Sequence, residues 1–202
     1  MSVAGKREFT RIQKERRAEI LDAALSAFSE AGYRGASIND IAERAGMSTP
    51  RLLYHFSGKE ALYTELINQT LELWMEPLSK IVDTDEPIDM ICQYIKRKLV
   101  MSQTHHRESR LFASAVLVGV KNTDLRVFEP EKTLFDEKIA LINSWIERGL
   151  IAPVDPHHLI YSIWATTQHY SDFEEQISSL SPQKMPSLFQ DCLLYTSDAA
   201  DD

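Results

Sequence analysis

The stretch that decides the fold runs from residue 37 to residue 62 and reads SINDIAERAGMSTPRLLYHFSGKEAL. It contains three helix-start signals in quick succession, one at each of Ser37, Ser48 and Ser57. The first has an acid three residues later, the second precedes Pro50 in a first helical turn, and the third forms a capping box with Glu60. Three helices are therefore expected to start within about twenty residues of one another.

The connection at Gly46-Met47 sets the arrangement of the first two of these helices. A turn this short joins two helices that meet at a steep angle, which is the helix-turn-helix pattern. The second helix, from about Thr49 to His55, is then the one that would enter the major groove of DNA.

Apolar residues on both sides of this stretch recur at helical spacing, and the chain has only 7 glycines, which argues against strands. We expect an all-α fold. A first helix ends at Gly32 and has one apolar stripe, formed by Ile20, Leu21, Ala24, Leu25 and Phe28. Five later helices are expected over residues 62–81 with a kink at Pro77, 88–102, 107–118, 123–148 and 156–179.

The 202 residues are 44% hydrophobic and 26% charged, with a net charge of -8 from 22 basic and 30 acidic residues. Taken alone, this negative net charge argues against a nucleic-acid partner. The charge is, however, distributed unevenly along the chain. The first 60 residues hold ten basic and eight acidic side chains, so the other 142 hold twelve and 22. The helix-turn-helix part can therefore approach phosphates. Residues 61–202 are acidic and suit a role other than binding DNA.

No apolar run is long enough to span a membrane, and the polar N-terminus is not a signal peptide, so we expect a cytoplasmic protein without a membrane partner. Residues 192–202 read CLLYTSDAADD and resemble a translated sequencing adapter. We therefore expect the native sequence to end near residue 191 as part of a longer chain. Cys92 is then the one native cysteine, which excludes an intramolecular disulfide.

Three motifs agree in order and spacing with one family: AGYRGAS (31–37), IAERAGMS (41–48) and LYHFSGKEAL (53–62). They resemble the DNA-binding domain of TetR-family transcriptional regulators. The resemblance implies a basic arm over residues 1–15, a DNA-binding domain over 16–62, and an effector-binding and dimerisation domain over 63–191. It also implies a homodimer that binds a double-stranded DNA operator.

The helix dipole and free N–H groups at the start of the recognition helix favour phosphates, and its side chains face base edges. We expect Thr49, Arg51 and His55 near bases. The resemblance implies phosphate contacts for Ser37, Tyr54 and Lys59, and the complete predicted DNA-binding set is Ser37, Ser48, Thr49, Pro50, Arg51, Tyr54, His55 and Lys59. Lys59 has an alternative role as a solvated helix-start lysine, but its poor position for the helix dipole favours a functional one.

Further segments, among them LELWMEPL (71–78) and DPHHLIYSIWATTQHYSDF (155–173), resemble the pyrimidine-responsive members of this family. A flat, uncharged pyrimidine needs aromatic faces and partners for its amide edge. The resemblance implies an effector such as uracil or thymine. The predicted ligand-binding residues are Trp74, Lys98, Arg110, Trp164, Thr167 and Gln168, of which Thr167 lies one position off the face shared by Trp164 and Gln168.

Each of these assignments has an alternative. The tryptophans can be ordinary core residues, and Gln168 and His169 can be polar groups at a dimer interface. Adjacent histidines at 105–106 and 157–158 diverge by about 100° on a helix and lack metal-ligand spacing. We find no catalytic, phosphate-loop or cofactor motif, so we expect neither an enzyme nor a cofactor.

The sequence therefore predicts a ligand-controlled DNA-binding regulator, a repressor of pyrimidine or nitrogen metabolism genes. The alternatives are a regulator of the same fold that answers another small molecule and, less favoured, an enzyme on a helical scaffold. The family has one further long helix after Pro182, and SLFQ (187–190) is its only sign here, so dimerisation of the present chain is an open question.

Overall fold

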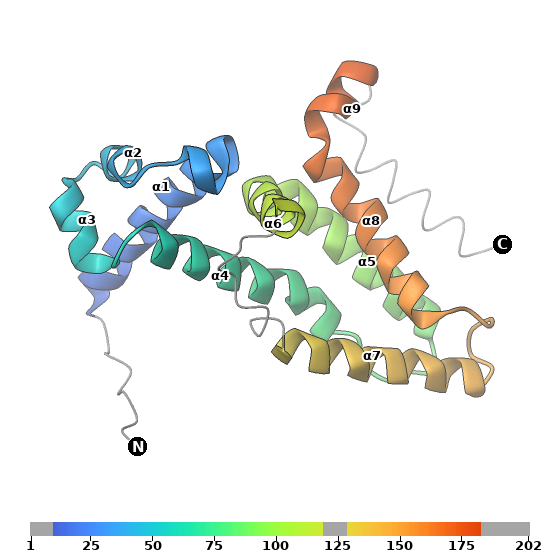
Figure 1. The fold of residues 1–202 in the computed structure, drawn as a ribbon. Coiled ribbons are helices and arrows are strands. Elements are labelled where there is room, and N and C mark those ends of the chain that lie inside the picture. Colours follow the sequence, from blue (N-terminus) through green and yellow to red (C-terminus); the bar gives the residue numbers. More distant parts are fainter. Residues whose placement is uncertain (1–9, 119–128, 183–202) are drawn as a thin grey trace. The chain divides into compact units, whose positions relative to one another are not determined.

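The computed structural model describes residues 10–118 and 129–182, and all regular structure within them is helical (Figure 1). The predicted all-α fold is confirmed for these residues. The helices are α1 (Arg11–Gly35), α2 (Ile38–Arg44), α3 (Thr49–His55), α4 (Lys59–Ser79), α5 (Pro87–Thr104), α6 (His106–Val118), α7 (Glu129–Glu147), α8 (Pro156–Asp172) and α9 (Glu174–Leu180). None of these helices combines the length and apolarity that crossing a bilayer requires. The chain divides into two compact units, residues 1–67 and 68–202.

The N-terminal unit is built on α1, whose first turn is closed by a reciprocal capping box between Thr10 and Gln13. All five residues of the predicted apolar stripe are buried, so that prediction is confirmed. Gly32 takes a left-handed φ of 67°, as expected, and one short helical turn follows it to Gly35.

The helix-turn-helix agrees closely with the sequence prediction. Ser37 caps α2 by accepting a hydrogen bond from the Asp40 N–H (3.1 Å), and Gly46 makes the turn with φ of 62°. The recognition helix α3 has the predicted bounds, and Leu52 is its buried anchor. α4 begins at Lys59, one residue later than a cap on Ser57 predicts.

The C-terminal unit packs α4, α5, α7 and α8 around Trp145, which is completely buried. The Trp145 indole N–H donates to Asp83 Oδ1 (2.9 Å), and Arg148 bonds the same carboxylate at 2.7 Å. Those two hydrogen bonds hold the pKa of Asp83 below its ordinary value, the larger effect coming from Arg148. The connection between α4 and α5 is thereby tied to the end of α7.

One predicted helix is interrupted in the structure. The helix expected over 156–179 is broken at Phe173, whose ψ of 26° interrupts the regular geometry between α8 and α9. No glycine or proline marks this position, so the pattern of residues could not reveal it. The expected start of a helix at residue 123, the segment 187–190 and the tail 192–202 lie outside the described residues.

Candidate DNA-binding surface and effector pocket

The recognition helix presents an exposed polar and aromatic face. Ser48, Pro50 and Arg51 are exposed, and the Tyr54 side chain is 79% exposed. Arg51 has no ion pair within the described part of the chain, and Ser48 makes no side-chain capping bond, so both are available to DNA. A large exposed tyrosine beside an unpaired arginine suits a surface that stacks on or bonds to nucleic acid.

Two residues predicted to lie near bases also have contacts within the unit. The Thr49 hydroxyl donates to Asn39 Oδ1 (2.9 Å), which joins the start of α3 to α2. The half-buried His55 packs its ring edge-on against Tyr54, with 5.3 Å between ring centroids. These contacts fix the orientation of the recognition helix, and base contacts by Thr49 and His55 stay a prediction.

Lys59 has a structural role that the sequence did not reveal. Its ammonium donates to the backbone carbonyls of Tyr33 (2.8 Å) and Ala36 (3.0 Å) and lies 4.6 Å from the centre of the Tyr33 ring. Cations are favoured at a helix C-terminus, which is where the end of α1 places these carbonyls. Its position at the start of α4 is therefore not in itself a sign of function. A phosphate contact through the remaining ammonium N–H stays a prediction.

Arg17, the second residue of the predicted DNA-binding domain, holds the end of α3 in place. Its guanidinium donates to the His55 carbonyl (2.7 Å), pairs with Glu65, and lies 4.0 Å from the centre of the buried Phe56 ring. Arg11 and Arg16 pair with Glu15 and Glu19 on the same helix. Because α1 begins at Arg11, the last five residues of the predicted arm are helical.

We expect Arg17→Met to lower the free energy of unfolding by about 2–3 kcal/mol, because a partly buried carboxylate and a helix-end carbonyl lose their partner. Arg11→Met is the matched control, since the Arg11 side chain is solvent-exposed and its pair spans one helical turn. Urea denaturation of both variants measures the difference. Equal destabilisation by the two substitutions would contradict the structural role of Arg17.

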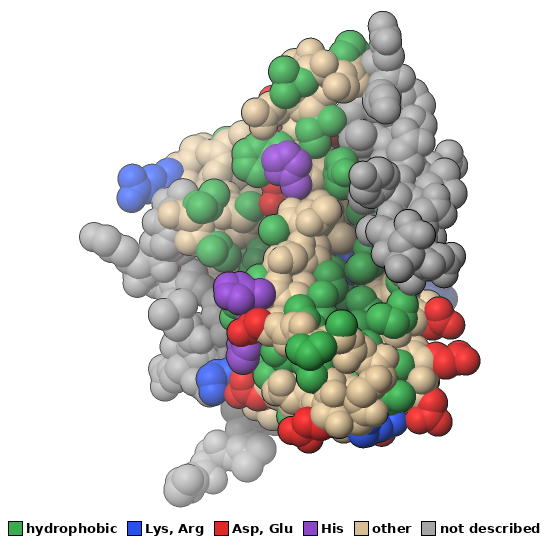
Figure 2. Space-filling model, turned by 90° about the vertical axis from the view of Figure 1, so that its right-hand side faces the viewer, with side chains coloured by type: hydrophobic (Ala, Val, Ile, Leu, Met, Phe, Trp, Pro, Cys, Tyr) green, Lys and Arg blue, Asp and Glu red, His purple; other side chains and the backbone are tan. Residues whose placement is uncertain are grey.

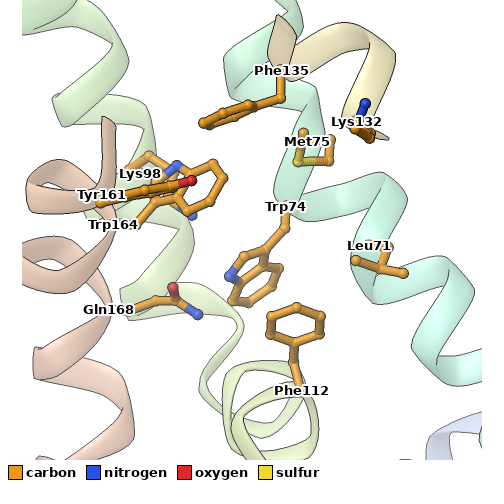
Figure 3. A pocket seen from close by; sticks show the side chains of 10 residues that line it. All are labelled: Leu71, Trp74, Met75, Lys98, Phe112, Lys132, Phe135, Tyr161, Trp164 and Gln168. Carbon is orange, nitrogen blue, oxygen red and sulfur yellow. The ribbon is translucent and has the colours of Figure 1, made fainter. Parts of the chain in front are cut away.

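The C-terminal unit contains a pocket of about 250 Å³ between α4, α5, α6, α7 and α8 (Figure 3). Its walls are mostly apolar and aromatic. The lining residues are Leu71, Trp74, Met75, Lys98, Phe112, Lys132, Phe135, Tyr161, Trp164 and Gln168. A pocket of this size and composition suits a small ring compound.

Aromatic rings define the shape of this pocket. The Phe135 and Tyr161 rings are stacked, with 10° between their planes. The centroid of the Trp164 ring lies 5.7 Å from that of the Phe135 ring. The Trp164 indole N–H donates to the Tyr94 hydroxyl (2.6 Å), which fixes the ring's orientation. Burial is the main cause that raises the pKa of Tyr94 to about 12, so this phenol stays protonated.

Polar groups converge on the same space. The Trp74 indole nitrogen is buried and has no hydrogen-bond partner among the described residues. The Gln168 carboxamide lies across the pocket from it (Figure 3). An unpartnered buried N–H costs about 1–3 kcal/mol, which an acceptor on a ligand would recover. Lys98 contributes an almost fully buried amine, 5.2 Å from the centre of the Trp74 ring.

The structure brings four of the six predicted ligand-binding residues to this pocket: Trp74, Lys98, Trp164 and Gln168. Thr167 is buried outside the lining, and its hydroxyl donates to the Ile163 carbonyl of its own helix (2.7 Å). Arg110 is also outside the lining and pairs with Glu174 (3.2 Å). The geometry of the pocket therefore does not indicate direct ligand contact by Thr167 or Arg110.

The sequence prediction missed six lining residues, which are Leu71, Met75, Phe112, Lys132, Phe135 and Tyr161. Tyr161 had a usable signal, because it lies three residues before Trp164 on the helix face that also carries Gln168. Phe112 and Phe135 come from other helices, so no local spacing links them to the tryptophans.

Two models of known families together match most of the chain. One, described as "Bacterial regulatory proteins, tetR family", matches residues 20–66. The other, described as "YcdC-like protein, C-terminal region", matches residues 67–190.

The chain is also similar to individual proteins. The HTH-type transcriptional regulator RutR of Escherichia coli (strain K12) is 40% identical to it over 181 residues, which are 90% of this chain and 84% of the relative. The structure of the transcriptional regulator SCO4942 from Streptomyces coelicolor superposes with a TM-score of 0.69 at 20% identity, covering 89% and 94% of the two chains. That of AibR in complex with isovaleryl coenzyme A and operator DNA gives 0.64 at 21% identity, covering 77% and 85%.

These similarities extend through both units and agree with the helix-turn-helix and the separate pocket described above. The similar proteins are regulators of transcription rather than enzymes. The chain belongs to the TetR family of bacterial transcriptional regulators, which bind operator DNA and small-molecule effectors.

Proposed function

We propose that this protein is a repressor whose operator binding is controlled by a small pyrimidine such as uracil or thymine. The observation that carries the proposal is the pocket itself, where aromatic rings and the Gln168 carboxamide surround a buried Trp74 N–H that has no acceptor within the described parts of the chain. The 40% identity to RutR supports a related effector.

The pocket's chemistry favours a flat ring with oxygen acceptors. Aromatic walls stack on planar rings, and a pyrimidine dione offers two carbonyl oxygens to the donors Trp74 and Lys98. Gln168 has both a donor and an acceptor, which matches an amide edge. A cavity of about 250 Å³ accommodates one ring of this kind.

Operator binding requires two recognition helices at a fixed separation, so we propose that the protein acts as a homodimer. The face formed by α8 and α9 supports this proposal. Phe173 is 50% exposed and Leu180 76% exposed, and Figure 2 shows hydrophobic side chains on this face with acidic ones at its lower margin. Exposed apolar side chains of this kind suit contact with a second copy of the chain.

The proposed control rests on α4. This helix begins at Lys59, which holds the end of α1, and it carries Leu71, Trp74 and Met75 of the pocket further along. A ligand that prefers one position of α4 biases the separation of the two recognition helices and lowers operator affinity. Genes of pyrimidine or nitrogen metabolism are the proposed targets.

A second candidate effector is an acyl coenzyme A, because the similar structure of AibR holds isovaleryl coenzyme A and operator DNA. The apolar walls of the pocket suit an acyl chain. The cavity volume argues against it, since a whole coenzyme A is several times larger than one pyrimidine.

Titration calorimetry with uracil, thymine and isovaleryl coenzyme A separates these candidates. We expect saturable binding of uracil or thymine and none of the thioester. Binding of the thioester alone would replace the pyrimidine assignment while keeping an effector-controlled regulator.

A further inference from the structure

Lys98 is the one lysine or arginine that the described residues bury, with 1% of its side chain exposed. It lies on α5 and lines the pocket. A buried ammonium is costly unless it has a hydrogen-bonded partner of opposite charge. Lys98 has no hydrogen bond and no ion pair within the described part of the chain, so only the Trp74 ring and the charge of Asp172 offset this cost.

The surroundings of Lys98 explain why no partner is available. The facing group on α4 is the Trp74 ring, and α8 brings Gln168 and the Asp172 carboxylate to its vicinity. Asp172 already accepts from the Ser109 hydroxyl of α6 (2.5 Å) and acts on Lys98 only through its charge. Within the described residues, Trp74 has a buried indole N–H without an acceptor, and the Lys98 ammonium over its ring makes no hydrogen bond.

Resting on the proposed function, we propose that Lys98 determines which effectors the pocket accepts. Its ammonium donates to an oxygen acceptor on the effector, so the site takes a ring with a carbonyl at this position and rejects one with an amino group there. Two donors that face each other are both left unpaired, and a dry pocket penalises unpaired polar groups strongly.

The same contact couples effector binding to a proton. Burial lowers the pKa of Lys98 to about 8, and the charge of Asp172 opposes that change. An acceptor on the effector stabilises the ammonium and raises this pKa, so bound protein keeps a proton that free protein loses. The affinity is therefore constant at pH values below the pKa of the free protein and falls above it.

The other titratable groups near Lys98 do not produce this alkaline change. The phenol of Tyr94 on α5 has its pKa raised to about 12 by burial. Desolvation raises the pKa of Asp172 above its ordinary acidic value, against the Ser109 hydrogen bond and the charges of His169, Lys98 and Arg110. Lys132 of α7 lines the same pocket but is exposed and paired with Asp136.

The test uses thymine and 2,4-diamino-5-methylpyrimidine, which replaces both ring carbonyls of thymine by amino groups. We expect the wild-type protein to prefer thymine by about 100-fold or more. We also expect its thymine affinity to fall about tenfold between about pH 7 and about pH 9, as Lys98 loses its proton. Lys98→Met should lose both the preference and the pH dependence, and without ligand it should melt at a higher temperature than wild type.

Lys96→Met is the matched control, because it removes an exposed lysine from the same helix, two residues before Lys98 and outside the pocket lining. We expect it to keep the preference and the pH profile. Equal binding of the two compounds by wild type, or a flat pH profile for thymine, overturns the role of Lys98 and leaves the pyrimidine effector in place. Binding of neither compound at any pH overturns the proposed pyrimidine effector itself.

Discussion

Replacing Arg51 with alanine is expected to weaken specific operator binding by about 100-fold or more, while leaving the fold unchanged. Arg51 is exposed in the first turns of α3 and makes no ion pair within the described residues. One arginine bonded to a guanine contributes about 1–3 kcal/mol of discrimination, and a dimer loses this contribution twice. Fluorescence anisotropy with a duplex that the wild-type protein selects from a random pool measures the loss.

Arg44→Ala provides the control for this experiment. Arg44 lies on the neighbouring helix α2 and has the same charge, but it pairs with Glu30 (2.9 Å) and Asp40 (3.1 Å). Its removal should change operator affinity by less than about threefold, as expected of a side chain that makes no base contact. If Arg44→Ala weakened binding as much as Arg51→Ala, total charge rather than base recognition would explain both results.

Replacing Gln168 with methionine is expected to weaken effector binding by about 10- to 100-fold, with operator affinity unchanged in the absence of effector. Methionine keeps the length of the side chain and removes its donor and acceptor. The amide edge of a pyrimidine would then stay unpaired in a pocket lined by aromatic rings. Quenching of the fluorescence of Trp74 and Trp164 by uracil or thymine reports the affinity.

Thr167→Val tests whether the effect belongs to the pocket or to α8 as a whole. Thr167 is adjacent to Gln168 and buried, and its hydroxyl bonds the Ile163 carbonyl of the same helix. We expect an effector affinity within about threefold of wild type, because the lost bond is local to the helix. A large loss in this variant would mean that Thr167 contacts the effector, as its place in the predicted ligand-binding set requires.

The local features of the N-terminal unit were the most predictable from the sequence. The cap on Ser37, the left-handed Gly32 and the bounds of α3 depend on residues within a few positions of one another. The roles of Lys59 and Arg17 were not predictable in this way. Their partners Tyr33 and Glu65 lie 26 and 48 residues away in the sequence, and nothing in the spacing indicates which cation meets which carbonyl.

The pocket residues also divide into those that the sequence could predict and those that it could not. Trp164 and Gln168 share a face of one helix, so their association follows from helical periodicity. Phe112 and Phe135 reach the pocket from α6 and α7, and their contribution depends on how five helices pack. The break at Phe173 has a similar origin, because Ser109 and Arg110 of α6 bond residues on either side of it, Asp172 and Glu174.

The most direct test of effector-controlled operator binding measures one complex under two conditions. The wild-type protein is held on its selected operator duplex while uracil or thymine is added, and the bound fraction is followed by anisotropy. We predict saturable release at the ligand concentrations that quench the pocket tryptophans. An operator complex that stays fully bound after the tryptophan signal has saturated would contradict control of DNA binding by this pocket.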